Sequence, residues 1–143
     1  MDNYTFVCIG SNKIIYDSLG PRIGDKLENA FSKNNNIQVY GTMENPIHLK
    51  NAYLFLEDRN LFQNQIVILI DSCLGIKEKI GSIYLSTGGI EIGKAFGRSI
   101  YFPAHINIKT IIGNKNYMPN WNIKQIDNLA TRVCNNITKT IKT

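Results

Sequence analysis

Runs of apolar residues mark five segments of the chain as strands. Residues 4–9 (YTFVCI) and 65–70 (QIVILI) are continuous runs rich in aromatic and β-branched side chains, which is typical of strands covered on both faces. Residues 37–40 (IQVY) predict a shorter strand. Residues 79–85 (KIGSIYL) and 105–112 (HINIKTII) alternate in part between apolar and polar positions, which predicts two further strands.

Helices are predicted between and after these strands. Residues 17–31 and 122–143 repeat apolar side chains at helical intervals, and Pro21 suits the first turn of the first helix. A further helix is predicted over residues 47–60. Residues 87–97 (TGGIEIGKAFG) contain too many glycines for a regular helix and predict a loop.

The resulting order β-α-β-α-β-β-β-α predicts an α/β protein. Strands that alternate with helices form mostly parallel sheets with helices on both faces, and the adjacent late strands add at least one antiparallel pairing. We therefore expect a three-layer α/β/α sandwich around a mixed sheet of about five strands. No linker, repeat or low-complexity segment divides residues 1–143, so we expect one domain.

Charge and hydropathy indicate whether the protein binds nucleic acid or membranes. Lysine and arginine outnumber the acidic residues by 16 to 11, giving a formal net charge of +5. The basic residues are scattered, with a mild cluster at Lys139 and Lys142, which favours a solvated surface over a nucleic-acid-binding one. The longest apolar run, residues 66–70, is far too short to span a membrane. We expect a soluble protein that binds neither nucleic acid nor membranes.

The three cysteines, Cys8, Cys73 and Cys134, have no paired spacing. Together with the lack of a signal peptide, an odd scattered set predicts reduced thiols and a cytoplasmic location. Cys8 lies inside an apolar run and suits a buried position. Cys73 follows Asp71 by two residues and is a possible nucleophile, although no base stands beside it in the sequence.

Two aspartates are predicted at the carboxyl edge of the sheet. In open α/β sheets, sites form where strands end and loops follow, and Asp71 comes directly after the apolar run 65–70. Burying its carboxylate is costly unless the group is paired, metal-bound or protonated. Asp71 alone can cap a turn, and Asp17 or Ser18 can cap the first helix. Because both aspartates follow neighbouring strands, they predict an acid/base pair or a divalent-metal site.

The two histidines receive different interpretations. His105 opens the last predicted strand, where a structural hydrogen bond competes with a role as proton carrier or third metal ligand. His48 stands beside Lys50 and suits a surface position. The loop after the first strand is not a nucleotide-binding loop, because it has neither GxGxxG spacing nor a Gly-Lys-Ser/Thr element.

Four segments, in order, resemble a known family. VCIGSNKIIYDSLGP (7–21), VYGTMENPIHLKN (39–51) and ILIDSCLG (68–75) are similar to motifs of the YyaC family of spore proteases, and the first and third also to the germination protease. IYLSTGGIEIGKAFG (83–97) resembles the glycine-rich segment that follows, although Ile92 stands where a proline is common. These segments span nearly the whole chain.

The resemblance implies a hydrogenase-maturation-protease-like (phosphorylase/hydrolase-like) fold. It also implies a peptidase of sporulating bacteria, in the forespore or mother cell, with Asp17 and Asp71 as catalytic acids. In maturation proteases the corresponding acids and a later histidine bind metal, which implies Asp17, Asp71 and, loosely, His105 here. The implied partner is a protein or peptide substrate, with small acid-soluble spore proteins as one class. We assign substrate binding to residues of the first two loops, Gly10, Ser11, Gly41, Thr42 and Glu44.

Three hypotheses remain open from the sequence. In the first, Asp17 and Asp71 share a proton and activate water against a peptide carbonyl. In the second, both acids and His105 hold one divalent metal. In the third, the chain is a non-enzymatic binding or assembly protein that retains the protease fold, because no strong nucleophile–base motif is present.

Overall fold

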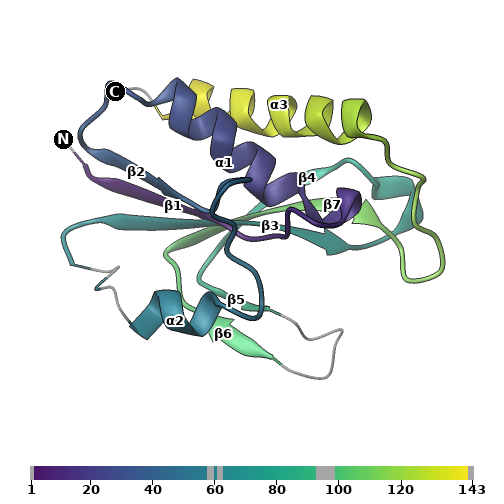
Figure 1. Ribbon diagram of the computed structural model, residues 1–143, viewed down its shortest axis with the longest axis horizontal. Helices are drawn as coiled ribbons and strands as arrows, with labels where there is room; N and C mark the ends of the chain where they lie inside the picture. Colours follow the sequence, from purple (N-terminus) through teal and green to yellow (C-terminus); the bar gives the residue numbers. More distant parts are fainter. Residues whose placement is uncertain (1, 58–59, 61–62, 93–98, 142–143) are drawn as a thin grey trace.

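A five-stranded mixed sheet with the strand order β2-β1-β3-β7-β4 forms the centre of the computed structural model, which describes residues 2–57, 60, 63–92 and 99–141 (Figure 1). All neighbouring strands are parallel except β4, which pairs antiparallel with β7. The strands are β1 (Tyr4–Cys8), β2 (Ile37–Tyr40), β3 (Ile66–Leu74), β4 (Ile83–Thr87) and β7 (Ile106–Gly113).

Helical and strand elements cover the two faces of this sheet unequally. Helices α1 (Leu19–Ala30) and α3 (Ile123–Thr140) pack on one face. The other face is covered by α2 (Ala52–Glu57) and by a two-stranded antiparallel sheet of β5 (Ile90–Ile92) and β6 (Ile100–Phe102). Short 3-10 helices η1 (Ile15–Asp17) and η2 (Lys77–Lys79) lie in the connections.

Side chains alternate between the two faces along the central strands. On β1, Phe6 packs beneath α1 and α3, whereas Val7 packs toward α2. On β3, Ile68 likewise packs beneath α1 and α3, and Leu69 packs on the opposite face. Both faces of these strands are therefore apolar cores, which explains why the continuous runs in the sequence predict them well.

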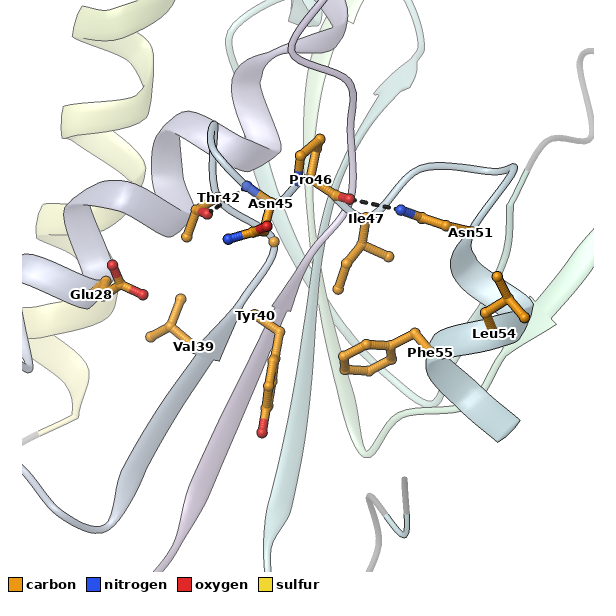
Figure 2. A pocket seen from close by; sticks show the side chains of 11 residues that line it. Glu28, Val39, Tyr40, Thr42, Asn45, Pro46, Ile47, Asn51, Leu54 and Phe55 are labelled. Carbon is orange, nitrogen blue, oxygen red and sulfur yellow. Dashed lines mark hydrogen bonds between the residues drawn. The ribbon is translucent and has the colours of Figure 1, made fainter. Parts of the chain in front are cut away.

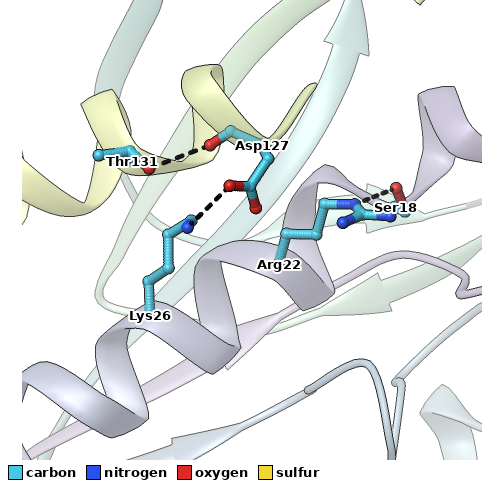
Figure 3. A network of polar contacts seen from close by, with 5 residues as sticks. All are labelled: Ser18, Arg22, Lys26, Asp127 and Thr131. Atoms are coloured by element: carbon cyan, nitrogen blue, oxygen red, sulfur yellow. Dashed lines mark hydrogen bonds and ion pairs between the residues drawn. The ribbon is translucent and has the colours of Figure 1, made fainter. Parts of the chain in front are cut away.

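Helices α1 and α3 are also joined by a polar contact on their outer side (Figure 3). Lys26 Nζ on α1 lies 3.2 Å from Asp127 Oδ2 on α3. Both side chains are partly exposed, so this ion pair contributes at most about 1 kcal/mol to stability. The α1–α3 packing therefore depends mainly on the buried apolar residues beneath it.

The predicted fold class is confirmed, but the helix predicted over residues 47–60 is wrong at its start. Helix α2 begins at Ala52 because a turn occupies the preceding residues. Asn51 holds that turn: its Oδ1 accepts a hydrogen bond from the N–H of His48, and its Nδ2 donates to the carbonyl of Pro46. Residues 58–59, at the predicted end, lie outside the described residues.

Other boundaries also differ from the predictions. Strand β3 continues to Leu74, so Asp71 lies inside the strand rather than after it. Strand β4 begins at Ile83 instead of residue 79, because η2 and Gly81, whose φ is +92°, turn the chain first. The loop predicted over residues 87–97 contains the end of β4 and all of β5; residues 93–97 lie outside the described part of the chain.

Helix length and hydropathy also bear on the membrane prediction. Among the described residues, no helix combines the length and apolar character needed to cross a bilayer.

Candidate functional site

The loop after β2 leaves the sheet through a glycine that no other residue replaces easily. Gly41 has a φ of +89°, and a Cβ atom there would lie 2.0 Å from the carbonyl oxygen of Cys8. An L side chain would therefore meet both backbone strain and a collision. The equivalent close contact beneath α1 is at Gly20, where a Cβ atom would lie 2.0 Å from the carbonyl oxygen of Ile9. These two glycines let the loops crowd around the end of β1.

The loops after β1 and β2 are tied to each other by hydrogen bonds. Ile47 forms a parallel bridge with Ile9, and the N–H of Gly10 donates to the carbonyl of Ile47 over 2.9 Å. The Nδ2 of Asn12 donates to the carbonyl of Met43 over 2.8 Å. The chain around Ile47 thus takes the place of β2 beside the extended end of β1.

Asp17 is held at this edge by η1. Ser18, which is 1% exposed, donates from its Oγ to the carbonyl of Ile15 and accepts from Nε of Arg22 (Figure 3). The carbonyl of Asp17 accepts the N–H of Ser11 over 2.8 Å. Ser18 occupies the N-cap position of α1, so the alternative that Asp17 is the N-cap does not hold.

Asp71 lies where β3 runs past the end of β1. The pairing of β1 with β3 ends at Cys8 and Ile70, whereas β3 continues beside β7 with Asp71 opposite Lys109. The alternation along β3 directs Asp71 to the face that carries α2 and β5–β6. Its Oδ1 accepts a hydrogen bond from the N–H of Ser72 over 2.9 Å. That local bond satisfies part of the carboxylate and leaves the rest of it for other partners.

The environment raises the pKa of both aspartates. Burial raises the pKa of Asp17 to about 6. Burial also raises the pKa of Asp71 to about 7; the negative charge of Asp17 acts in the same direction, while the Ser72 N–H and the Lys109 ammonium oppose it. Asp17 and Asp71 are therefore close enough to interact electrostatically. Between about pH 6 and pH 7 the pair holds roughly one proton, which is the state that acid/base catalysis requires.

The structure does not bring His105 to this pair. Because Ile106 pairs with Ile68, His105 lies beside Val67, four residues before the position of Asp71 along parallel strands. At about 3.3 Å per residue this is roughly 13 Å. The Nδ1 of His105 accepts a hydrogen bond from the N–H of Val67 over 2.9 Å. This is the structural hydrogen bond that the sequence offered as the alternative to a catalytic or metal-binding role.

The donor groups near the pair do not fit a metal site. No group of three or more His, Cys, Asp or Glu side chains suited to a metal ion occurs in the described part of the chain. The metal set of Asp17, Asp71 and His105 is therefore not assembled. The physical reason is that His105 opens β7 and so lies at the amino edge of the sheet, whereas the aspartates lie at the carboxyl edge.

The cysteines show no sign of an activated nucleophile. Cys73 is partly exposed, and its pKa is raised, chiefly by burial and further by Asp71, although Lys109 lowers it. A raised pKa keeps the thiol protonated at neutral pH. Cys8 and Cys134 are buried.

The residues assigned to substrate binding divide into two groups. Gly41 and Thr42 line a cavity of about 350 Å³ between β2 and α2 (Figure 2). Gly10 is buried at the end of β1, Ser11 is partly buried, and Glu44 is exposed. None of these last three is among the residues that line the cavity.

Two charged residues of this region were not predicted from the sequence. Lys109 stands opposite Asp71, and only the strand register reveals the pairing. One signal was available, since a lysine interrupts the apolar positions of residues 105–112. Glu28 lines the cavity from α1, where its helical position resembles any solvated charge.

Comparison with known sequences adds a family. A family model described as "Protein of unknown function (DUF1256)" matches residues 1–141. The "Uncharacterized protein YyaC" of Bacillus subtilis (strain 168) is 31% identical over 113 residues, which cover 78% of this chain and 54% of that protein. The chain thus spans about half the length of this curated relative.

Two solved structures share the fold. A [NiFe] hydrogenase maturation protease HycI from Thermococcus kodakarensis KOD1 superposes with a TM-score of 0.60 at 16% identity, covering 99% of this chain and 93% of that one. A hydrogenase 2 maturation peptidase from Thaumarchaeota archaeon SCGC_AB-539-E09 gives a TM-score of 0.55 at 16% identity, covering 97% of each chain. At this identity the likeness establishes the fold alone.

Proposed function

The chain belongs to the DUF1256 family, and we propose that it is a peptidase that hydrolyses a peptide bond of a protein substrate with the Asp17–Asp71 pair. The observation that carries the proposal is the placement of two carboxyls at one edge of the sheet, with Asp17 at the end of η1 and Asp71 where β3 passes the end of β1. Burial there raises their pKa values to about 6 and about 7. The N–H of Ser72 lowers the pKa of Asp71, as it would for a carboxyl that caps a turn, but burial outweighs this effect.

The reaction needs one ionised and one protonated carboxyl. Asp17, with the lower pKa, serves as the base that removes a proton from water as the water oxygen attacks the carbonyl carbon of the peptide. Asp71, with the higher pKa, holds the proton that passes to the leaving amine nitrogen. The carbon–nitrogen bond breaks, and one carboxyl of the pair regains a proton as the other loses one. Lys109 keeps Asp71 from becoming too weak an acid.

The maturation-protease fold supports a protein substrate rather than a small molecule. Small acid-soluble spore proteins are the substrate class that the family resemblance suggests, with a role in sporulation. We propose this substrate class and this role in sporulation together with the peptidase activity, and a likeness to the germination protease with them.

A cleavage assay tests the proposal directly. The protein, its Asp71→Asn variant and an Asp127→Asn control are incubated at pH 6.5 with a spore protein extract, with and without a chelator, and new amino termini are identified by mass spectrometry. We expect cleavage by the parent protein and by Asp127→Asn, in which only the surface pair with Lys26 is lost. Asp71→Asn is expected to be inactive.

Two outcomes would contradict the proposal. Cleavage that survives Asp71→Asn would remove the pair from the mechanism. Binding of an extract protein without any new amino terminus would favour the non-enzymatic alternative, in which the chain keeps the fold as a binding or assembly protein.

A further inference from the structure

The cavity beside β2 is the start of a longer groove. A second cavity, of about 400 Å³, lies along the same strand and shares Glu28, Val39 and Tyr40 with the first. In Figure 2, Glu28 and Val39 lie on the side of α1, and Phe55 lies on the opposite side near α2. The shared residues make the two cavities one groove that follows β2.

Strand β2 presents an open edge to this groove. It is the end member of the sheet order and pairs with β1 alone. The N–H of Tyr4 donates to the carbonyl of Asn36, so in this parallel register the peptide groups of Gln38 and Tyr40 face β1. The N–H and carbonyl of Val39 consequently point away from the sheet. An extended peptide can pair with them as an added strand.

The charge of the groove is negative. Glu28 is the only charged side chain among the described residues that line the two cavities. The surrounding walls combine apolar and amide groups, and Val39 and Tyr40 lie next to Glu28. Lysine and arginine fit such a wall, because their aliphatic stems pack on apolar surface while the charged end reaches a carboxylate. The remainder of the protein is net positive, so the preference arises locally.

The groove is connected to the aspartate pair. Ile47, which lines the cavity, bridges to Ile9, and Ile9 follows the pairing of Cys8 with Ile70, which places it beside Asp71. Two strand spacings of about 4.8 Å separate Ile47 from Asp71, which makes roughly 10 Å. An extended peptide spans that distance with about three residues.

We propose that the β2 groove binds an extended segment of the substrate protein as an added strand and accepts a lysine or arginine side chain against Glu28, and that this segment continues past Ile47 toward the aspartate pair. This inference rests on the proposed peptidase function for the identity of the bound segment as a substrate, but the binding itself does not require hydrolysis.

Peptide binding to the Asp71→Asn variant tests the groove apart from catalysis. The probes are four fluorescein-labelled octapeptides of serine, threonine and valine that differ only in one central residue, arginine, lysine, glutamine or glutamate. Fluorescence anisotropy at low salt is expected to give Kd values about tenfold lower for the arginine and lysine peptides than for the glutamine peptide. In 0.5 M salt the difference is expected to shrink, because the charges lie near solvent.

Variants of the groove separate charge from strand pairing. Glu28→Gln is expected to abolish the preference for basic peptides, and Glu28→Lys to reverse it toward the glutamate peptide. Glu78→Gln is the matched control, since Glu78 is exposed in η2 outside the groove. Val39→Pro is expected to weaken all four peptides alike. A proline is tolerated there because the lost N–H faces outward at an edge strand.

The results distinguish this inference from the proposed function. Equal binding of the four peptides, or a preference that survives Glu28→Gln, would overturn the inference even if the parent protein cleaves proteins. A basic preference that depends on Glu28 in a protein without hydrolytic activity would retain the groove and remove the peptidase. In an active protein, mapped cleavage sites are expected to carry a lysine or arginine at a fixed distance from the cut.

Discussion

The two faces of the central sheet differ in the side chains that they carry. Beneath α1 and α3 the strands contribute a continuous apolar core, in which Phe6, Ile23 and Ile126 are fully buried, and the buried Thr110 of β7 lies on the same face. On the opposite face an apolar core lies under α2 and β5–β6, but β3 and β7 continue beyond it and carry Asp71 and Lys109. The charged side chains therefore lie on the face where β3 and β7 extend beyond the elements that cover the sheet.

This difference separates stability from chemistry. A substitution beneath α1 and α3 should change the free energy of unfolding and leave the acid/base groups as they are. A substitution at the end of β3 should do the reverse, and at neutral pH the loss of a carboxylate whose pKa is raised in the folded state can even stabilise the fold.

The largest expected effect is the loss of hydrolysis in Asp71→Asn. An amide can neither hold nor deliver the proton, so kcat/KM for a protein substrate should fall by about 10³-fold. The measurement is initial-rate cleavage at pH 6.5, with thermal unfolding measured in parallel. A melting temperature equal to or above that of the parent protein would show that folding is not the cause, whereas retained activity would contradict the role of Asp71.

A substitution on the opposite face should break the fold without touching the site. Ile126 on α3 is fully buried, so Ile126→Ala should lower the free energy of unfolding by about 3 kcal/mol through lost burial and the remaining cavity. Urea denaturation measures this loss. At temperatures where the variant stays folded, kcat/KM should match that of the parent protein; a large change would mean that the two faces are coupled.

The pH dependence of stability should follow Asp17 and, to a greater extent, Asp71. Because the pKa of Asp71 is raised in the folded protein, the folded state binds more protons than the unfolded chain between about pH 4 and pH 7. Stability should therefore fall as pH rises through that range, by about 2 kcal/mol after allowance for solvent at the site. In Asp71→Asn the fall should be smaller, and the remainder should come from Asp17, whose pKa is also raised. Urea denaturation of both proteins at pH 4.5 and pH 8 makes the comparison, and parallel curves would contradict the raised pKa.

The smallest expected effect is a shift of the pH profile in Lys109→Met. Removing the ammonium raises the pKa of Asp71 further, since Lys109 lowers it in the parent protein. The alkaline limb of kcat/KM should move upward by about half a pH unit. Lys115→Met, at an exposed position after β7, serves as the control. A limb that does not move would assign the upper pKa to another group.

The elements that the sequence predicted are those specified by local pattern. The apolar run at residues 65–70 identifies β3, and the helical repeat after residue 122 identifies α3. Strands β5 and β6 were not predicted, because each has three residues and is stabilised by pairing with the other. The late start of α2 likewise follows from hydrogen bonds of Asn51 that no periodicity reveals.

The site was predictable in part for the same reason. Asp17 follows β1 and Asp71 lies where β3 passes the end of β1, so both lie at one edge of the sheet, within electrostatic reach of each other. Their catalytic role stays a prediction. His105 was misplaced although the sequence held the signal, because a residue that opens a parallel strand lies at the opposite edge. The neighbours Lys109 and Glu28 depend on strand register and on cavity shape, which only the folded chain defines.

The most direct test of the central claim is an NMR titration of the aspartate carboxyl carbons in the protein without substrate. We expect two resonances with midpoints near pH 6 and pH 7, assigned by Asp17→Asn and Asp71→Asn. Asp17→Asn is also expected to lower the midpoint of Asp71, because a neighbouring negative charge is removed. Two carboxyls that titrate independently near pH 4 would contradict the pair.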